Sequence, residues 1–332
     1  MEIRILYVAA LMLTMLLTAG ISRKLIPFLK SKKMGQKILE IGPRWHKNKE
    51  GTPTMGGIAF IVAICAVFAA VLGIGCYLGK IKECGFVLLV LGFALCNGLI
   101  GVVDDLAKFS HGQNQGLTAI QKYLLQLFAA GLFLFGARVF GYLDTVLVIP
   151  FTELYIDLGV FYYVFSLILI TGTVNAVNLT DGIDGLASSV TMVVCVFFSI
   201  VGLYTARSDM ALLSGCGVGG CLGFLVYNFH PARVFMGDTG SLFLGGLVVG
   251  LAYMMGSPLL IVLVGIIYMV ETLSVMLQVG YFKLTHGKRL FKMSPIHHHF
   301  EKCGWSEVKI VSVFSVITLI ICAIVFVFSY LL

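Results

Sequence analysis

The hydrophobic and polar positions of the chain fall into long blocks. Apolar runs of roughly 17–25 residues alternate with shorter polar connections, and a run of that length is what an α-helix needs to cross a bilayer. Ten such spans are predicted, at Ile3–Ile21, Met55–Leu78, Gly85–Val103, Ala119–Ala137, Gly159–Val177, Ala187–Thr205, Met210–Tyr227, Ser241–Gly256, Leu259–Phe282 and Val308–Leu332. With ten spans, both chain ends lie on one side of the membrane, and the odd-numbered connections lie on the other.

The composition agrees with this pattern, since 59% of the residues are hydrophobic, only 12% are charged and the mean hydropathy is +1.01. Soluble domains average about 45–50% apolar and about 25% charged residues, so soluble, disordered and fibrous classes are excluded. The runs are also too long for barrel strands. We therefore predict an all-α polytopic integral membrane protein that forms one domain over residues 1–332. The connection at 138–158 alternates around Pro150 and predicts a small external β-hairpin.

The basic residues set the orientation of the predicted spans. Of the 23 Lys and Arg residues, 18 fall on the side of the odd-numbered connections. Nine of these lie between the first two spans, among them Lys33, Lys37, Arg44 and Lys47. The positive-inside rule places the five odd connections in the cytoplasm and both termini outside. The net charge of +7 is mostly this topology signal, so we expect no nucleic-acid partner.

Carboxylates gather at the cytoplasmic ends of the predicted spans. A carboxylate at membrane depth costs about 2.5–3.5 kcal/mol on insertion scales, so it is rare there without a role. If these acids were only solvated loop residues, acids would be equally common in the outer connections. The pattern predicts a single site on the cytoplasmic face, built from acids spread over the sequence. They are Asp104, Asp105, Asp181, Asp184 and Asp238.

The first acidic element joins two carboxylates to one cation. If the span's helix continues past Val103, Lys108 shares a face with Asp104 and Asp105. Adjacent carboxylates repel, and a cation relieves that repulsion. Mg²⁺ in particular binds one or two carboxylates together with substrate phosphates. A solvated Asp-Asp turn that closes a helix is the alternative.

Two further elements combine polar side chains with glycines. Asn175, Asn178 and Asp181 recur every three residues and would share a face of one helix end, followed by Gly182. Amides and a carboxylate suit a nucleotide and its metal, although Asx-turns between two helices are the alternative. The segment at 237–241 leads into the eighth span, where backbone amides could receive an anion while Asp238 faces a metal.

Aromatic and histidine residues complete the candidate set. Phe235 could stack a nucleobase, or it could serve as a packing residue. His297, His298 and His299 follow Pro295 in the last cytoplasmic connection. Consecutive histidines cannot all reach one tetrahedral Zn²⁺, so imidazoles that bind phosphate or carboxylate are favoured.

Together these motifs resemble the polyprenyl-phosphate N-acetylhexosamine-1-phosphate transferase superfamily, and most closely its phospho-N-acetylmuramoyl-pentapeptide transferase branch. The resemblance covers nearly the whole chain in the number of spans and the order of the cytoplasmic loops. The Asp-Asp-x-x-Lys and Asn-x-x-Asn-x-x-Asp-Gly elements mark the superfamily. The segment Gly51-Thr-Pro-Thr54-Met-Gly-Gly57 and the Pro-x-His-His-His segment narrow it to the branch.

The resemblance implies a reaction and its partners. Phospho-MurNAc-pentapeptide would pass from UDP-MurNAc-pentapeptide to undecaprenyl phosphate, giving lipid I and UMP in the first membrane step of peptidoglycan synthesis. The enzyme would lie in the bacterial inner membrane with its active site on the cytoplasmic face, and would form a homodimer. The phosphoanhydride of the donor is exchanged for another, so ATP is not required.

The resemblance also implies roles for individual residues. Mg²⁺ would be held by Asp238 with Asn175 or the Asp104/Asp105 pair, of which Asp105 lies close to the metal. Asp104 would deprotonate the lipid phosphate, unless one aspartate acts instead as a nucleophile. The catalytic set is Asp104, Asp105, Asp238, Lys108, His297, His298 and His299. The substrate-binding set is Lys49, Thr54, Asn178, Asp181, Gly182, Asp184, Asn228, Phe235 and Gln278. The role of Glu271 stays open.

Two other functions are compatible with parts of the pattern. A sibling transferase that uses UDP-GlcNAc would share the carboxylate elements, but its usual last-loop histidine motif differs from His-His-His. An ion-coupled transporter would also carry intramembrane acids, but near mid-bilayer on broken helices. The position of these acids at one face counts against transport.

Overall fold

The structure is a computed structural model that describes residues 2–32, 49, 51–81, 84–110 and 116–331. The described elements are α1 (Glu2–Ser31), α2 (Gly57–Tyr77), α3 (Gly85–Ser110), α4 (Ala119–Val139), β1 (Val146–Val148), β2 (Tyr155–Asp157), α5 (Phe161–Thr180), α6 (Leu186–Tyr204), α7 (Ser208–Asn228), α8 (Gly237–Met254), α9 (Leu260–Val264), α10 (Ile266–Leu284), α11 (Ile296–Lys302) and α12 (Glu307–Tyr330). The basic residues Lys33, Lys37, Arg44 and Lys47 lie outside this set.

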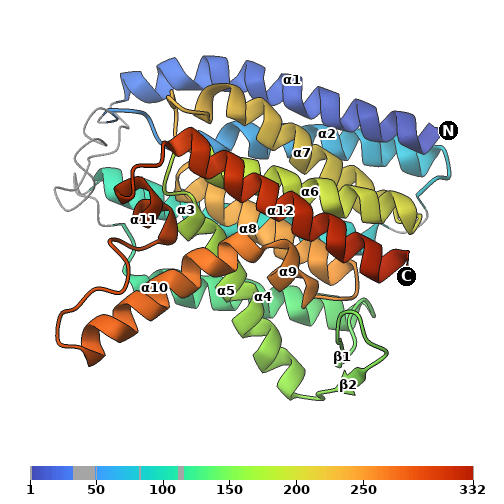
Figure 1. Cartoon of the computed structure of the whole chain (residues 1–332). Coiled ribbons are helices and arrows are strands. Elements are labelled where there is room, and N and C mark those ends of the chain that lie inside the picture. The colour runs from blue at the N-terminus through green and yellow to red at the C-terminus, as the bar shows by residue number, and fades with distance from the viewer. Residues whose placement is uncertain (1, 33–48, 50, 82–83, 111–115, 332) are drawn as a thin grey trace.

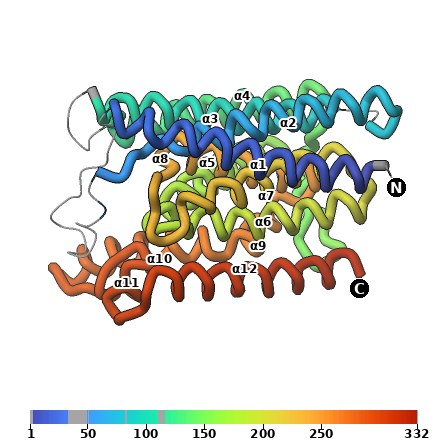
Figure 2. Tube along the Cα trace, turned by 90° about the horizontal axis from the view of Figure 1, so that it is seen from above, coloured from blue at the N-terminus to red at the C-terminus, as the bar shows by residue number. Residues whose placement is uncertain are grey.

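Among the described residues, nine helices are long and apolar enough to cross a membrane, namely α1 to α8 and α12. They match nine of the ten predicted spans, so the prediction of an all-α polytopic membrane protein is confirmed. Most of the long helices run roughly along one direction (Figure 1). The start of α1, the end of α12 and the β-hairpin lie at one end of this bundle, and α11 lies at the other (Figures 1 and 2).

The predicted hairpin is present as a small antiparallel sheet. Strands β1 and β2 pair with Leu147 opposite Ile156. Thr145 donates a hydrogen bond to Asp157, and Gly159 donates its backbone N–H to the same carboxylate at 3.0 Å. These two donors lower the pKa of Asp157, which lies on the surface. The sheet closes the connection between α4 and α5.

Helix α8 forms the core of the bundle. Nearly all of it is buried, and it packs against α3, α5, α2 and α6. Its Phe243 ring lies 6.2 Å from Phe60 of α2, and Phe60 makes an edge-to-face contact with Phe224 of α7 at 5.3 Å. Close packing of this kind holds helices together in a bilayer, where burial from water contributes little between them. The first turn of α8 is therefore fixed in position by its neighbours.

The predicted span at 259–282 is not one continuous helix. The chain forms the short helix α9, breaks at Gly265 and continues as α10. The Gly265 N–H is bonded to Ile261 and Leu263 carbonyls of α9, and the residue begins α10 without a side-chain cap. Glycine in a helix interior costs about 1 kcal/mol relative to Ala, which favours a break there. Helix α10 then leaves the bundle at an angle (Figure 1).

Several helices continue beyond their predicted apolar ends. Helix α1 reaches Ser31 and α3 reaches Ser110. Asp104, Asp105 and Lys108 lie in the extension of α3. They therefore share one face of the helix, as predicted for a helix that continues past Val103. Helix α5 ends at Thr180, so Asn175 and Asn178 also lie within a helix and Asp181 is its C-cap.

Candidate functional site

Three carboxylates from two helices meet at one end of the bundle. Asp104 and Asp105 lie near the end of α3, and Asp238 lies in the first turn of α8. Each offers one oxygen, and these oxygens lie within 4.8 Å of one another. All three side chains are largely buried. We call Asp104, Asp105 and Asp238 the carboxylate cluster.

Two lysines partly neutralise the carboxylate cluster. The Lys108 Nζ lies 2.8 Å from Asp104 Oδ2, 3.6 Å from Asp105 Oδ1 and 2.7 Å from Asp238 Oδ2. Lys122 of α4 lies 2.8 Å from Asp238 Oδ2 and 3.8 Å from Asp104 Oδ2. Three carboxylates and two ammonium groups leave one excess negative charge. A cation or a proton is needed to balance it.

Asp105 also caps helix α8. It accepts the backbone N–H of Asp238 at 3.2 Å and that of Thr239 at 2.9 Å, together with the Thr239 hydroxyl at 2.8 Å. A carboxylate at a helix N-terminus is stabilised by the unpaired N–H groups and the helix dipole. The sequence suggested that these amides receive an anion, and in the structure that anion is Asp105. Asp105 therefore joins α3 to α8 as well as contributing charge.

The two asparagines of α5 have different partners. Asn178 Nδ2 donates to Asp238 Oδ1 at 2.7 Å and to the Ser241 hydroxyl at 2.8 Å. Asn175, one turn earlier, pairs instead with the Gln126 amide at 2.7 Å and with the Thr171 carbonyl at 2.8 Å. Asn178 thus orients Asp238 directly. The metal-binding role of Asn175 stays a prediction.

A second polar cluster lies around Lys49. Its Nζ lies 2.7 Å from Asp184 Oδ1 and 2.6 Å from Glu307 Oε1. Asp184 Oδ2 also accepts the Ala232 N–H at 2.9 Å and lies 3.0 Å from His230 Nδ1. Glu307 in turn accepts the Asp184 N–H at 3.0 Å. These contacts join segments that are more than 250 positions apart in the sequence.

The segment after Lys49 lies along the start of α8. Phe235 donates its N–H to the Pro53 carbonyl, while Gly56 and Gly57 donate theirs to Phe235 and Met236 at 2.9 and 3.0 Å. The Thr54 hydroxyl lies against Gly237. The Phe235 side chain is half-buried. Asn228 is buried and bridges the Val234 carbonyl and the Ser188 hydroxyl.

The three histidines have separate environments. His297 is fully buried, and its Nδ1 lies 3.0 Å from Glu271 Oε2. Among the described residues, His297 Nε2 and Glu271 Oε1 have no hydrogen-bond partner. A side chain on Gly182 would overlap that Nε2 nitrogen, so the ring faces the Asp181–Asp184 loop. His298 Nδ1 lies 2.6 Å from Glu301, and His299 Nδ1 accepts the Lys292 N–H.

Asp181 interacts electrostatically with acids of both polar clusters, the carboxylate cluster and the cluster around Lys49. Burial, together with the negative charges of Asp238, Asp105 and Asp184, raises the pKa of the Asp181 carboxyl to about 8. In the metal-free protein this carboxyl is therefore mostly protonated at neutral pH. A cation bound among the carboxylates would offset part of their negative charge and so lower the pKa of Asp181.

The structure brings together most of the residues predicted from the sequence and adds others. The sequence analysis assigns no role to Lys122, His230 or Glu307. Lys122 and Glu307 each lie in the first turn of an apolar helix, where a lone charge also suits the helix end or the membrane interface. Gln278 is predicted to bind substrate, but its Oε1 accepts the Phe291 N–H at 2.8 Å. Its predicted role is untested.

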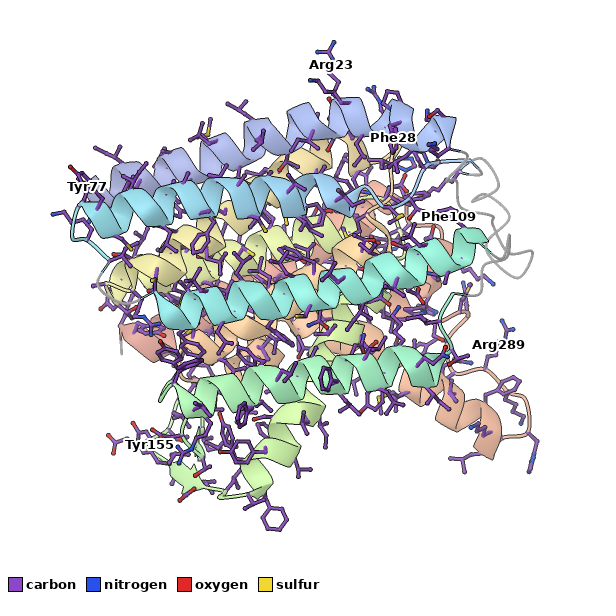
Figure 3. The ribbon with its side chains drawn as sticks, turned by 180° about the vertical axis from the view of Figure 1, so that it is seen from behind. Arg23, Phe28, Tyr77, Phe109, Tyr155 and Arg289 are labelled. Atoms are coloured by element: carbon purple, nitrogen blue, oxygen red, sulfur yellow. The ribbon has the colours of Figure 1, made fainter. Side chains whose placement is uncertain are left out.

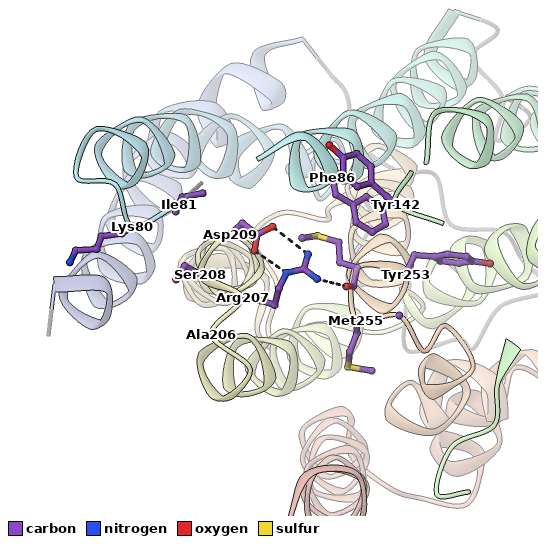
Figure 4. A pocket seen from close by; sticks show the side chains of 12 residues that line it. Lys80, Ile81, Phe86, Tyr142, Ala206, Arg207, Ser208, Asp209, Tyr253 and Met255 are labelled. Atoms are coloured by element: carbon purple, nitrogen blue, oxygen red, sulfur yellow. Dashed lines mark hydrogen bonds and ion pairs between the residues drawn. The ribbon is translucent and has the colours of Figure 1, made fainter. Parts of the chain in front are cut away.

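A cavity of about 640 Å³ lies at the opposite end of the bundle (Figure 4). Its lining includes Phe86 at the start of α3 and Met254 at the end of α8, far along both helices from the carboxylates. Arg207 in its wall bonds the Met254 carbonyl at 3.0 Å and pairs with Asp209. This cavity is separate from the candidate site.

The comparisons with known proteins agree on one family. Residues 86–256 match glycosyl transferase family 4, and residues 49–61 match signature 1 of the phospho-N-acetylmuramoyl-pentapeptide-transferases. A phospho-N-acetylmuramoyl-pentapeptide-transferase of Clostridium botulinum is 48% identical over 91% of this chain and 90% of its own length. The corresponding protein of Clostridium perfringens is 46% identical over 96% of this chain and 97% of its own length.

Proposed function

The chain belongs to the phospho-N-acetylmuramoyl-pentapeptide-transferase family, and from this membership we propose that it transfers phospho-MurNAc-pentapeptide from UDP-MurNAc-pentapeptide to undecaprenyl phosphate, giving lipid I and UMP. It is a multi-pass membrane transferase of peptidoglycan synthesis. The observation that supports these substrates is the group of three carboxylates and two ammonium groups at one end of a membrane bundle. A water-soluble diphosphate and a lipid phosphate can meet there. We assign this end to the cytoplasmic face of the bacterial inner membrane, and we propose a homodimer on family membership alone.

Mg²⁺ is the proposed cofactor. The donor set fits a hard cation, because three carboxylate oxygens lie within 4.8 Å of one another and carry excess negative charge. Asp238 and Asp105 would hold the ion beside Asp104, and Asn175 remains a candidate ligand. When bound, the ion would neutralise charge on the phosphates.

Catalysis would depend mainly on positioning and charge neutralisation by the protein's own groups. Lys108 and Lys122 would bind phosphate oxygens in place of some of their present carboxylate contacts. Asp104 would accept the proton of the lipid phosphate. An aspartate that attacks as a nucleophile is the rival scheme. In both schemes one phosphoanhydride replaces another, so no ATP is consumed.

The donor would lie across the loops that surround the carboxylates. Asp181, Gly182, Asp184, Asn228 and Phe235 would form the uridine pocket. Lys49 and Thr54 would contact the donor from the segment beside α8. The three histidines and Gln278 would face the sugar and diphosphate.

The first experiment measures UMP release by the detergent-solubilised protein. UDP-MurNAc-pentapeptide and a polyprenyl phosphate are expected to give UMP with Mg²⁺ and none after chelation with EDTA. UDP-GlcNAc is expected to give none under the same conditions. UMP from UDP-GlcNAc alone would move the protein to the sibling transferases. Absence of UMP from both donors, in folded protein, would contradict the proposal.

Glu271 is expected to act through His297. Its carboxylate accepts from Nδ1, which leaves Nε2 toward the Asp181–Asp184 loop. Glu271→Ala should lower transfer by roughly 10–100-fold, the loss typical when the outer-shell partner of a metal-bound imidazole is removed. Glu271→Gln, which keeps an acceptor oxygen, should lose less. In a double-mutant cycle, His297→Ala with Glu271→Ala should be no slower than His297→Ala alone. Additive losses would show that the two residues act separately.

A further inference from the structure

The segment Tyr281–Lys292, which we call the basic arm, projects from the bundle and carries a concentration of positive charge. It includes the last turn of α10 and the turn that follows (Figure 1). Lys283, Lys288, Arg289 and Lys292 are all exposed. The sequence has no acidic residue between Glu271 and Glu301 to offset them. The basic arm is therefore a strongly positive surface.

Large apolar side chains alternate with these charges. Leu284 is 82% exposed, and Phe282 and Leu290 are 46% and 48% exposed. Along α10 the outward side chains Met276 and Leu277 are also mostly exposed, which suits contact with lipid. Apolar and basic side chains on one short segment are typical of the boundary between acyl chains and head groups. The basic arm thus has the composition of an interfacial segment.

The basic arm is tied to the residues around it. Gln278 of α10 accepts the Phe291 N–H at 2.8 Å, which closes the turn onto the helix. Lys292 donates its N–H to His299 at 3.1 Å and its ammonium to the Lys302 carbonyl at 3.2 Å. The position of the basic arm is thereby linked to α11, which carries His297.

From these observations we propose that the basic arm docks on the anionic phospholipid head groups of the leaflet that borders the catalytic end. With the orientation proposed above, this is the cytoplasmic leaflet. Phosphates pair with the four cations, while Phe282, Leu284 and Leu290 insert below them. Each Lys or Arg held near an anionic surface contributes roughly fivefold to binding, so four together contribute on the order of 10²-fold or more. The contact fixes α11 relative to the membrane plane.

The test compares amide hydrogen exchange of the basic arm in the full-length protein in two kinds of nanodisc. One kind contains phosphatidylcholine alone, and the other contains phosphatidylcholine with phosphatidylglycerol. Residues 281–292 are expected to exchange at least about tenfold more slowly with phosphatidylglycerol, and high salt should remove the difference. This readout needs no transferase activity, so it is independent of the proposed reaction.

A charge-neutral variant and a matched control locate the effect. K283Q/K288Q/R289Q/K292Q should exchange like the wild type in phosphatidylcholine and gain no protection from phosphatidylglycerol. R23Q/K24Q/K30Q/K32Q removes three exposed charges from α1 and that of Lys32 directly after it. These lie on the opposite side of the molecule, so this variant should keep the protection (Figure 3). Equal exchange of the wild type in both nanodiscs, or equal loss of protection in both variants, would overturn the proposal. Protection by soluble pyrophosphate in phosphatidylcholine alone would assign the basic arm to a soluble anion instead.

Discussion

Asp238→Asn is expected to reduce transfer by at least about a thousandfold while the protein still folds and inserts. The substitution preserves the shape of the side chain but removes the charge that pairs with Lys108 and Lys122 at 2.7 and 2.8 Å. It also removes a proposed Mg²⁺ ligand and places an amide opposite the Asn178 amide. The remaining two carboxylates balance the two lysines. Without metal, the variant therefore has no unbalanced charge among these buried groups that would unfold it.

Melting curves with and without Mg²⁺ separate loss of the metal from loss of the fold. A ligand that binds only the native state stabilises it in proportion to the logarithm of its concentration over its dissociation constant. Mg²⁺ should therefore raise the melting temperature of the wild type but not that of Asp238→Asn. Asp144→Asn, in an exposed pair with Arg138, is the matched control and should behave as the wild type. Full activity of Asp238→Asn would rule out the metal assignment.

The sequence was informative where chemistry is carried by residues close together on one helix. Asp104, Asp105 and Lys108 share a face because α3 continues past its apolar run. Asn178 and Asp181 lie at one helix end for the same reason. Spacing along a helix is a local property, so it can be read without knowing the packing.

Residues that reach the site through packing could not be found in this way. Lys122 pairs with Asp238 across 116 positions, and Glu307 pairs with Lys49 across 258. Each looks in the sequence like a single charge at the start of an apolar helix. The hydropathy pattern does not locate the break at Gly265 either, because the apolar content of 259–282 continues on both sides of it. Hydropathy reports burial in lipid but does not report whether the backbone is continuous.

The dual role of Asp105 shows the same limit more sharply. By sequence it is one of two adjacent acids that suit a metal. In the structure its two oxygens accept N–H groups of Asp238 and Thr239, and its α3 backbone approaches α8 at Gly101. The geometry of the carboxylate cluster thus depends on a close contact between two helices. A glycine allows that contact, because it has no Cβ.

Gly101→Ala is accordingly expected to disable the site without touching any charged group. A Cβ at this position would overlap the Asp238 carbonyl and would lie 2.5 Å from the Thr239 nitrogen. These are backbone atoms of a buried helix, so no rotamer change can relieve the overlap, and α3 must move away from α8. A displacement of about 1 Å in a catalytic constellation costs on the order of 10²-fold in rate. Overpacking also lowers the free energy of unfolding by about 1–3 kcal/mol.

Gly92→Ala provides the matched control on the same helix, since a Cβ there meets no atom within 4 Å. Both variants gain the same methyl group, so the helical preference of alanine is common to them. UMP release should be close to wild type for Gly92→Ala and about a hundredfold lower for Gly101→Ala, measured at a temperature where both remain folded. A Gly101→Ala protein that is destabilised yet fully active would mean that the carboxylates keep their alignment when α3 and α8 separate. In that case Asp105 would not be the link that aligns the carboxylate cluster. Loss of rate together with loss of the Mg²⁺-induced rise in melting temperature is the expected pair of results, because Asp105 reaches Asp238 only while the two helices are in contact.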